Sequence, residues 1–575
     1  MRLNDKLISF DSEAYRYKTR SGERQSLAMY DFYDGVTHYT GTDKTDLYFT
    51  LAGLSNKYGK IVVVAHNFSY DAQLSGLTKN LFVDNELCGL PLDKLIFSRP
   101  FFAQFSDDIR SIKLLDSFNY FNCSLATIAE AMGVKKTAST EYSLAPKEWN
   151  KYIRANYELV QNDTKILYDF MLRFIRQKSL EYGISIASVA YNTWHRHYYR
   201  HTIYKDKEIN ALALLSYRGG RCEAYRLNKE PVYLYDYDIN SLYPYVMLHH
   251  RYSTALHRKY AALDINDIVD SEYNYLVNID YELPSDCVRS PVVLRAKDGR
   301  LTQFLKYDNA WITGREAIAL KDAGANVVIH KALEFHAEDL FSRYVSTFYN
   351  LKKTALNDAE RLIYKYMLNS LYGKFGQHKR QTEVINIKEL PPAHRYILEH
   401  TAKSHVDIDG VRYNIHIKYI TISVDVEPKY NVVIASEITA NARLVNYEIQ
   451  KRLGFAHVYY TDTDSFFSDV QAPISLIGNE IGQLKIEHEG LCHVRGAKDY
   501  EFLDGLKKLK GIRHNATQLS DNEYIQQQFS SLLTRHRYNG VFVKSITKTV
   551  HRDANKLRYV RDSTGDLLGY PLSSG

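Results

Sequence analysis

HVYYTDTDSFFSDV, residues 457–470, sets two aspartates one residue apart between two short apolar, aromatic runs. The flanking runs predict two strands joined by a tight turn, and residues two apart in an extended chain point the same way. We therefore expect Asp462 and Asp464 to project together. Two neighbouring carboxylates repel each other unless a cation lies between them, so the pair favours a divalent metal held by hard oxygen ligands. A polar hairpin turn without a metal is the alternative explanation.

A second pair of aspartates ends another apolar, aromatic segment. In PVYLYDYDINSLYPYVM, residues 231–247, the predicted strand ends at Asp236 and Asp238, and Pro244 suits the first turn of a following helix. A strand that ends in a carboxylate and turns into a helix presents free backbone N–H groups beside a metal ligand. That geometry suits a nucleoside triphosphate carrying its magnesium ion.

A third segment carries the opposite charge. RLIYKYMLNSLYGKFG, residues 361–376, predicts a helix that ends near Gly373. One face of this helix carries side chains about one turn apart: Arg361, Lys365, Asn369 and Tyr372. Two cations on one face can hold phosphate oxygens, and a tyrosine beyond them offers a ring against which a base can pack. Lys353 is a further candidate cation, and a plain amphipathic helix is the alternative.

The composition is that of a large folded protein. With 575 residues, 45% of them apolar, the chain exceeds what one hydrophobic core supports, so we expect several domains. It contains neither a run of apolar residues long enough to span a membrane nor a leader at its start, so we expect no targeting signal and no membrane association. The net charge is +7, and basic residues outnumber acidic ones after Arg495. Such an end suits a phosphate backbone, or is simply a solvated charged face.

The three acidic and basic segments together resemble the polymerase motifs of family B DNA polymerases. DxNSLYP at 238–244, KxxLNSLYG at 365–373 and YxDTDS at 460–465 occur in the order of that family. The resemblance implies that Asp238 and Asp464 ligate two Mg²⁺ ions, with Mn²⁺ as a possible substitute, and that Asp462 assists nearby. It also implies a site for dNTP substrates: Tyr243 under the sugar, where it excludes ribonucleotides, Lys353 and Lys365 on the triphosphate, and Asn369 and Tyr372 along the nascent base pair. We expect Arg361, on the same helix face, to bind the nucleotide as well.

The N-terminal third resembles the three motifs of a DEDD-type 3′–5′ exonuclease. The motifs are ISFDSEA, IVVVAHNFSYD and NDTKILYDF, and the residues that the resemblance implies as ligands of two metals are Asp11, Glu13, Asp71 and Asp163, with Asn67 contacting DNA. Asp169 is a weaker alternative to Asp163. One position departs from the family, because Leu159 replaces the tyrosine that orients the attacking water. Tyr157 on a shifted helix is a candidate replacement, and slower proofreading is the other expectation.

Four shorter motifs resemble the protein-primed branch of the family, found in phages and linear plasmids whose genome ends carry a covalent terminal protein. They are SLATI at 124–128, YRGG at 217–220, TANAR at 439–443 and KDY at 498–500. The resemblance implies contacts to DNA or to the terminal protein from Ser124, Leu125, Tyr217, Arg218, Gly219, Gly220, Thr439, Arg443, Lys498 and Tyr500. The paired glycines of YRGG would let backbone approach a DNA strand.

The expected fold combines α/β and α+β domains. An RNase H-like exonuclease domain over 1–185 precedes a right-hand polymerase domain over 186–575. Within the second domain we expect a palm over about 205–255 and 421–495, fingers over about 351–375 and a thumb over about 500–575. The motif spacing leaves room for two insertions, a terminal-protein docking region over about 256–350 and a second over about 376–420. HVDIDGVRYNIHI predicts a hairpin around Asp409 and Gly410 in the second insertion, and a plain loop is the alternative.

The resemblance implies a DNA-directed DNA polymerase that replicates a linear genome, starts on a terminal protein, displaces the opposing strand and proofreads. Its partners would be primer-template DNA, the terminal protein and a single-stranded DNA-binding protein, in the cytoplasm of a host cell. A nucleic-acid-primed family B enzyme without terminal-protein dependence is the first alternative. A structural binder of DNA ends with decayed sites is the second, and the presence of every expected polymerase carboxylate argues against it.

Overall fold

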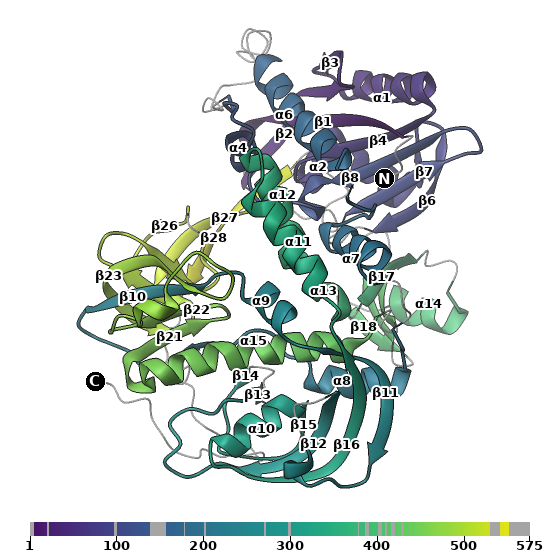
Figure 1. Cartoon of the computed structure of the whole chain (residues 1–575). Helices are drawn as coiled ribbons and strands as arrows, with labels where there is room; N and C mark the ends of the chain where they lie inside the picture. The colour runs from purple at the N-terminus through teal and green to yellow at the C-terminus, as the bar shows by residue number, and fades with distance from the viewer. Residues whose placement is uncertain are drawn as a thin grey trace.

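The structure is a computed structural model of the chain (Figure 1). It describes residues 5–19, 22–96, 101–137, 157–177, 179–199, 203–268, 272–296, 301–377, 379–385, 390–400, 405–408, 411–415, 420–426, 430–513, 515–529 and 541–550. These residues form a multidomain α+β protein with several sheets. Within the described ranges, every helix is too short or too polar to cross a membrane.

The N-terminal sheet is mixed, because β1 pairs with β4 and β4 with β8 in parallel, whereas β1 and β2 are antiparallel. Its order is β26-β27-β28-β2-β1-β4-β8-β7-β6-β5, and β3 pairs with β2. The N-terminal strands are β1 (Lys6–Thr19), β2 (Gly22–Tyr33), β3 (His38–Gly41), β4 (Lys60–Ala65), β5 (Glu86–Leu87), β6 (Leu90–Ile96), β7 (Phe102–Ser106) and β8 (Ser111–Asp116). Central strand β4, KIVVVA, is almost entirely buried, as suits a β-branched strand with helices on both faces.

Helices cover both faces of this sheet. Alternate residues of β4 pack into two different cores: Ile61 and Val63 with α1 and α2, and Val62 and Val64 with α6. The elements on these faces are α1 (Lys44–Tyr58), α2 (Phe68–Ser75), α3 (Leu77–Lys79), the π-helical turn η1 (Asn80–Asp84), the 3₁₀ turn η2 (Ser117–Asn119), α4 (Leu125–Ala131) and α6 (Tyr157–Ile175). On one of these faces α6 packs against β1 and β2.

The central sheet has the order β25-β24-β23-β10-β22-β21-β9. Its strands are β9 (Cys222–Ala224), β10 (Val232–Ile239), β21 (Val458–Asp462), β22 (Ser465–Ser468), β23 (Leu484–Gly496), β24 (Asp499–Phe502) and β25 (Lys507–Leu509). Helices α9 (Leu242–His249) and α15 (Val432–Leu453) pack on it, and α8 (Lys207–Ser216) packs on α15 (Figure 1). The short 3₁₀ turn η5 (Phe455–His457) precedes β21, and a second one, η6 (Ile474–Leu476), lies between β22 and β23.

A further sheet with its own core is formed by the chain between α9 and residue 339. We call residues 252–338 the insert. It contains β11 (Tyr252–Tyr260), η3 (Ile265–Asp267), β12 (Tyr273–Glu282), β13 (Leu294–Arg295), β14 (Leu301–Thr302), β15 (Lys306–Thr313), α10 (Gly314–Asp322) and β16 (Asn326–Glu338). Its main sheet has the order β11-β16-β12-β15, and α10 begins with a capping box between Thr313 and Glu316.

Two helices stand across from the central sheet. They are α11 (Ser342–Lys353) and α12 (Asp358–Ser370), and the side chain of Asn357 caps α12 by accepting from the Glu360 N–H. The short α13 (Tyr372–Phe375) follows, and α7 (Ile186–His197) packs beside them. Trp194 of α7 donates to the Leu340 carbonyl oxygen at 2.7 Å, so one apolar core joins the N-terminal domain to these helices.

The stretch after α13 forms a small antiparallel sheet of order β17-β20-β19-β18. It contains β17 (Lys379–Ile385), α14 (Pro392–Glu399), β18 (His405–Ile408), β19 (Val411–Ile415) and β20 (Ile420–Val426). β18 and β19 pair with Ile408 opposite Val411, as the predicted hairpin requires. The turn residues themselves, Asp409 and Gly410, lie outside the described residues.

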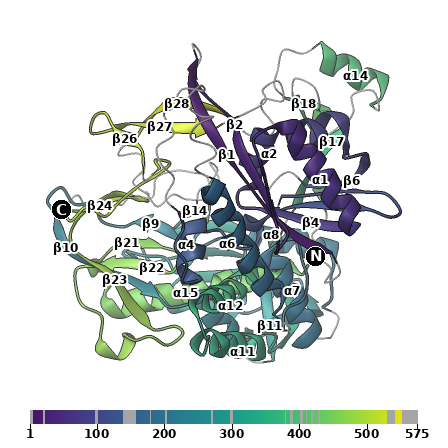
Figure 2. The ribbon, with the colours of Figure 1, turned by 90° about the horizontal axis from the view of Figure 1, so that it is seen from above.

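The stretch predicted as a thumb divides between two sheets. β24 and β25 continue the central sheet, whereas β26 (Thr517–Gln518), β27 (Glu523–Phe529) and β28 (Val541–Thr549) extend the N-terminal sheet. β28 pairs with β2, with Val541 opposite Gln25 and Val543 opposite Glu23 (Figure 2). Val541 and Val543 are buried in the N-terminal core, so burial of apolar side chains accompanies this pairing.

Candidate active sites

Asp238 and Asp464 lie where β10 meets the turn between β21 and β22. β10 and β22 are antiparallel with Asp238 opposite Ser465, and the Ile239 N–H donates to the Asp464 carbonyl oxygen at 2.8 Å. Both Asp238 and Asp464 line one cleft of about 1170 Å³. Two carboxylates from segments more than two hundred residues apart are thus brought together.

The turn separates Asp462 from Asp464, which differs from the expectation that both project together. Asp464 lines the cleft, whereas the Asp462 carboxylate lies 3.2 Å from the Lys498 ammonium and accepts from the Tyr460 hydroxyl at 3.3 Å. The reason is Thr463, whose φ of 66° is left-handed, so the two aspartates are not part of one extended strand. Asp462 therefore pairs with Lys498 beside the turn and is not one of the residues that line the cleft.

The two cleft carboxylates are electrostatically strained. Burial raises the pKa of Asp238 to about 6, and the neighbouring Asp464 and Glu487 add to the effect. Burial also raises the pKa of Asp464, and Asp462 contributes in the same direction. A divalent cation between the two oxygens would remove this cost, so the residues present fit a metal with hard oxygen ligands.

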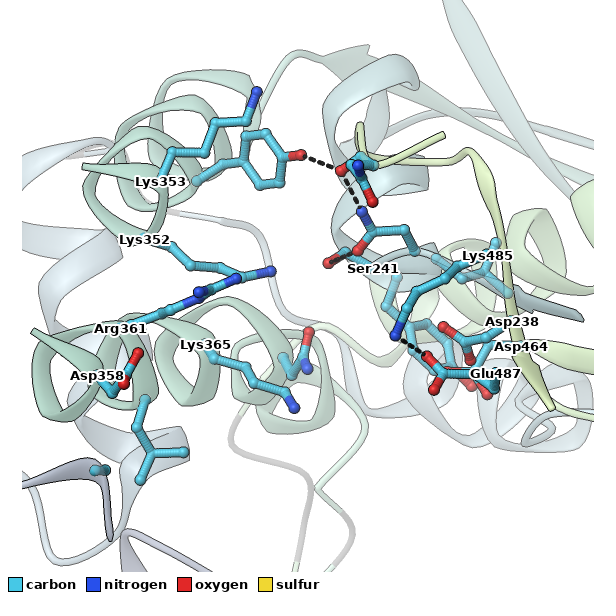
Figure 3. Close-up of a pocket in the computed structure, with 18 of the residues that line it drawn as sticks. Asp238, Ser241, Lys352, Lys353, Asp358, Arg361, Lys365, Asp464, Lys485 and Glu487 are labelled. Atoms are coloured by element: carbon cyan, nitrogen blue, oxygen red, sulfur yellow. Dashed lines mark hydrogen bonds and ion pairs between the residues drawn. The ribbon is translucent and has the colours of Figure 1, made fainter. Parts of the chain in front are cut away.

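The opposite wall of the cleft is cationic. Lys352, Arg361 and Lys365 extend from α11 and α12 toward the strands that carry the aspartates (Figure 3). Burial lowers the pKa of Lys352, and the like charges of Lys365 and Arg361 lower it further. Three cations that repel one another and face open space form a site for a polyanion.

Aromatic and amide side chains form the end of the cleft between the two walls. The rings of Tyr243 and Tyr372 stack with centroids 4.0 Å apart and planes at 14°, and both line the cleft with Asn369. Tyr243 comes from α9 and Tyr372 from α13, so the pair joins the central sheet to the two helices. A flat, half-polar surface of this kind suits a sugar and a base.

Lys353 lies at the rim of the cleft. Its ammonium pairs with both carboxylate oxygens of Glu480, at 2.6 and 2.7 Å, and its side chain is 47% exposed. Its neighbour Lys352, which the sequence did not single out, is the lysine that faces Arg361 and Lys365. Consecutive helix residues point about 100° apart, and sequence alone does not say which of two adjacent lysines faces a site.

Two further lining residues were missed. Lys485 and Glu487, on β23, pair at 2.8 Å beside Asp238. They lie two apart in the segment KIEHE, so the alternation of a strand places both on one face. Only the pairing of β23 with β10 shows that this face lies beside Asp238.

A second acidic cluster lies in the N-terminal domain. One carboxylate oxygen each of Asp11, Glu13 and Asp163 lie within 4.8 Å of one another, on β1 and α6. Burial raises the pKa of Asp11 well above its usual range, and Asp71 and Asp163 raise it further. Burial raises the pKa of Glu13 to about 7, with Asp163 as the next cause.

Asp71 and Lys136 complete this cluster. Asp71 is 2% exposed and accepts from the Ser12 N–H at 3.1 Å and the Ser12 hydroxyl at 2.6 Å. Lys136, absent from the sequence prediction, forms an ion pair with Asp163 Oδ2, while Asp163 Oδ1 is buried without a hydrogen-bond partner among the described residues. A buried carboxylate oxygen without a hydrogen bond, surrounded by other acids, is available to bind a cation. These carboxylates therefore also suit divalent metal ions. Asp169, the weaker alternative, pairs with Lys165 at 2.7 Å on the surface.

The structure does not support Tyr157 as the replacement for the missing tyrosine. Tyr157 begins α6 and packs against Ala28, Met29 and Val160. It precedes Asp163 by six residues, which turns it about 120° away from the acidic cluster around the helix. Leu159 is 3% exposed at the expected position. The phenol near the acids is Tyr70, whose pKa is raised by burial and then by Glu13 and Asp71, and whose hydroxyl donates to Gln25 at 2.7 Å.

Three of the predicted DNA contacts are buried, which corrects the interpretation of YRGG and TANAR. Arg218, Arg443 and Thr439 are 3%, 4% and 2% exposed. Arg443 donates to the carbonyl oxygens of Arg218 and Gly219 at 2.8 and 3.0 Å, and Thr439 donates within α15. These side chains hold the backbone of 217–220 in place, and their burial excludes direct contact with DNA in this structure.

The other predicted contacts have structural partners as well. Asn67 has a left-handed φ of 73° before α2, and the Ser124 hydroxyl accepts from the Thr127 N–H at 3.1 Å as the cap of α4. The Leu125 side chain is buried in the core, and the ring of Tyr217 lies against Gly376.

The KDY segment and the glycines of YRGG lie close to the turn at 462–464. Lys498 pairs with Asp462, and Tyr500 packs edge-on against Phe467 with centroids 4.8 Å apart. Gly220 lies against Thr463, whereas a Cβ at Gly219 would meet open space.

Comparisons with known proteins agree with this geometry. A family model described as DNA polymerase type B, organellar and viral, matches residues 132–452. A probable DNA polymerase of Podospora anserina is 28% identical over 342 residues, which are 53% of this chain and 27% of that protein. The DNA-directed DNA polymerase of Enterobacteria phage PRD1 is 26% identical over 305 residues, half of each chain. This chain thus spans about a quarter to a half of these two relatives.

The fold has a solved counterpart. Phi29 DNA polymerase complexed with primer-template DNA and incoming nucleotide substrates superposes with a TM-score of 0.68 at 15% identity, over 95% of this chain and 100% of that one. The likeness establishes a multidomain α+β polymerase fold.

Proposed function

The chain belongs to the type B DNA polymerases of organelles and viruses, and we propose that it is a DNA-directed DNA polymerase that extends a primer by two-metal nucleotidyl transfer. The observation that carries this proposal is the cleft. Two carboxylates with raised pKa values, Asp238 and Asp464, face Lys352, Arg361 and Lys365 across a space of about 1170 Å³. The carboxylates can bind divalent metal ions, and the cationic side chains opposite them can bind phosphates. Together they suit a nucleoside triphosphate with its metal ions.

Asp238 and Asp464 would hold the divalent ions, Mg²⁺ or Mn²⁺, because both ions prefer carboxylate oxygens. When bound, such ions lower the pKa of the primer hydroxyl and neutralise the departing pyrophosphate. The raised pKa of Asp238, about 6, still leaves this carboxylate ionised at neutral pH. The chain's own contribution is thus a pair of carboxylate ligands, Asp238 near the end of β10 and Asp464 in the turn before β22.

The remaining residues of the cleft would bind and orient the dNTP. The ammonium of Lys352 and the guanidinium of Arg361 donate to triphosphate oxygens, with Lys365 nearer the aspartates. The stacked rings of Tyr243 and Tyr372 then provide a flat surface for the sugar and base. Holding the nucleotide between two walls converts a bimolecular step into a nearly unimolecular one.

The N-terminal cluster supports a second activity, 3′–5′ excision of DNA. Asp11, Glu13, Asp71 and Asp163 would hold divalent ions that activate a water and stabilise the leaving oxygen. Lys136, which pairs with Asp163, would add positive charge beside the acids for the DNA phosphate. Because Leu159 is apolar, we expect excision without the usual tyrosine hydroxyl at that position.

We further propose that replication starts on a terminal protein, with the insert as its docking surface. The insert has its own apolar core and its own four-stranded sheet, so it is a separate unit that could present a surface to a partner. Strand displacement, a single-stranded DNA-binding partner and residence in a host cytoplasm belong to the same proposal. A nucleic-acid-primed enzyme is the alternative, since the chemistry of the cleft is the same in both.

Primer extension tests the main proposal. Purified protein is incubated with a labelled primer-template, dNTPs and Mg²⁺, Mn²⁺ or EDTA. We expect metal-dependent lengthening of the primer, and degradation when dNTPs are omitted. No lengthening with either metal would contradict the polymerase assignment. Incubation with a candidate terminal protein, labelled dATP and Mg²⁺ tests the priming proposal, which predicts covalent label on that protein.

A further inference from the structure

Residues 220–222, from the last glycine of YRGG onward, pack against the turn at 462–464, which we call the catalytic turn. The Thr463 N–H donates to the Arg221 carbonyl oxygen at 2.7 Å, and β9 pairs with β21 so that Cys222 lies opposite Asp462. A Cβ added to Gly220 would lie 2.5 Å from the Thr463 hydroxyl oxygen and 2.6 Å from its methyl carbon. The backbone of 220–222 therefore sets the position of the turn that carries Asp464.

The insert holds the other side of this segment. The Arg221 guanidinium donates to the Ser290 carbonyl oxygen at 2.8 Å and to the Gln303 side-chain oxygen at 3.1 Å. Arg218 donates to the Trp311 carbonyl oxygen at 2.5 Å. These three acceptors belong to the insert, so the segment is held between the insert and the catalytic turn.

Glu316 supplies the charge that makes this arrangement stable. It is 1% exposed on α10, and one of its oxygens accepts from Arg443 at 2.7 Å and lies 3.8 Å from Arg218. Its other oxygen accepts from the N–H and hydroxyl of Thr313 in the capping box. Burial alone would raise the pKa of Glu316, but Arg443 and then Arg218 bring it below its usual value, so the carboxylate is ionised.

The same arginine reaches from Glu316 to the glycine loop. Arg443 donates to the carbonyl oxygens of Arg218 and Gly219, directly before Gly220. Without the Glu316 charge, two buried guanidinium groups would lose their counter-ion, which is costly in a low-dielectric interior. The contacts thus run without interruption from Glu316 through Arg443 and the loop to Thr463.

We propose that Glu316 is a positioning residue for DNA synthesis: through Arg443 and Arg218 it presses the Gly219–Gly220 loop against Thr463 and so sets Asp464 relative to Asp238. The insert then contributes to every extension step, on a nucleic-acid primer as well as on a protein. This inference rests on the polymerase function proposed above. It predicts a defect in metal use and turnover, not in nucleotide affinity, because the triphosphate cations lie on α11 and α12.

Glu316→Gln tests the proposal, with Glu282→Gln as the matched control because Glu282 lies in the same insert and pairs with Lys306 on the surface at 3.1 Å. The measurements are kcat, the KM for dNTP, the Mg²⁺ concentration for half-maximal extension, and the excision rate of the same preparation. We expect Glu316→Gln to lower kcat about tenfold and to raise the Mg²⁺ requirement about fivefold, with KM and excision within about twofold. The control should match the parent.

Two results are decisive in opposite directions. Absence of extension by the parent protein rejects the polymerase function itself. A parent that extends, together with a folded Glu316→Gln variant of equal kcat and equal Mg²⁺ requirement, overturns the role of Glu316 while leaving the polymerase function intact.

A second pair of variants approaches the same contact from the loop and decides the matter if Glu316→Gln does not fold. Gly220→Ala pushes against Thr463 and should lower extension about tenfold with a raised Mg²⁺ requirement. Adding Thr463→Gly removes the clash, and glycine tolerates the left-handed φ of 66° at that position. We expect the double variant to recover most of the lost rate. A double variant no better than Gly220→Ala, or a Gly220→Ala protein that extends normally, would refute the proposed contact.

Discussion

The two carboxylate clusters of this molecule share their acids and differ in the charges around them. Around Asp11, Glu13 and Asp163 the described residues place one cation, Lys136, in direct contact with the acids. Across from Asp238 and Asp464, three cations on two helices face an open cleft. The first cluster can hold metal ions and one phosphodiester, whereas the second also has the positive charge for a free triphosphate.

The clusters also differ in the elements that build them. The N-terminal acids lie on β1, α2 and α6, and Asp71 accepts from Ser12. The cleft lies between a sheet and a pair of helices that share one apolar core, and the exposed pair of Lys353 with Glu480 spans its rim. A site that must admit a new nucleotide in each cycle benefits from walls that can separate, and a site that only cleaves does not.

The largest test of this comparison is Asp464→Asn. Loss of one of the two proposed metal ligands should lower extension by more than about 1,000-fold, while DNA binding and excision persist because the N-terminal cluster is untouched. Extension from a labelled primer and excision of the same primer without dNTPs are measured in parallel. Asp469→Asn is the control, since Asp469 lies seven residues from the turn's start and pairs with His457 at 2.8 Å. Extension near the parent rate would show that Asp464 holds no metal.

The reciprocal change is Asp11→Ala together with Glu13→Ala. Both acids are half-buried in the same cluster, so their loss should lower excision at least about 100-fold and leave extension within about twofold. The readout is release of the 3′-terminal nucleotide from single-stranded DNA. Metal-dependent release that survives in the double variant would place the nuclease site elsewhere.

These two sites show what the sequence could and could not predict. Asp238 and Asp464 were predictable because each lies at the end of an apolar strand or in the turn next to one, so both could meet at one edge of a sheet. The burial of Arg443 was not, since its counter-ion Glu316 lies 127 residues away in an insertion with no periodic link to TANAR. A motif identifies an arginine as important, but the partner decides whether it contacts DNA or the protein interior.

The choice between neighbouring residues was equally beyond the sequence. Lys352 and Lys353 occupy adjacent positions at the end of α11, and the crossing of α11 and α12 decides which one enters the cleft. The pairing of β28 with β2 joins segments more than five hundred residues apart, and no local pattern announces it. Local periodicity predicts elements, whereas long-range contacts decide which side chains meet.

Alanine at each of these lysines sharpens the description of the cationic wall. Lys352→Ala should raise the KM for dNTP about tenfold, the effect of one charge-assisted hydrogen bond shared among three cations. Lys353→Ala should change it by less than about twofold, because Lys353 is exposed and paired with Glu480. Steady-state single-nucleotide incorporation measures both. Equal effects, or a larger effect for Lys353, would contradict the assignment of Lys352 as the lysine that binds the triphosphate.

The smallest expected effect concerns a buried carboxyl of the polymerase core that has no part in either metal site. Burial raises the pKa of Glu437 to about 7, and the side chain accepts from the N–H and hydroxyl of Ser253. In the unfolded chain this group has a pKa near 4.5, so between about pH 4.5 and 7 the folded protein binds the proton more tightly and its stability falls as the pH rises.

Glu437→Gln cannot ionise and should not show this loss. The stability of the variant relative to the parent should therefore increase from about pH 4.5 to 7, by up to about 3 kcal/mol, and stay constant above that. Urea unfolding across this pH range measures the difference, with excision and extension unchanged at neutral pH. A difference that does not vary with pH would show that the pKa of Glu437 is the same in the folded protein as in the unfolded chain. The hydrogen bonds from Ser253 would then offset the effect of burial on this carboxyl group.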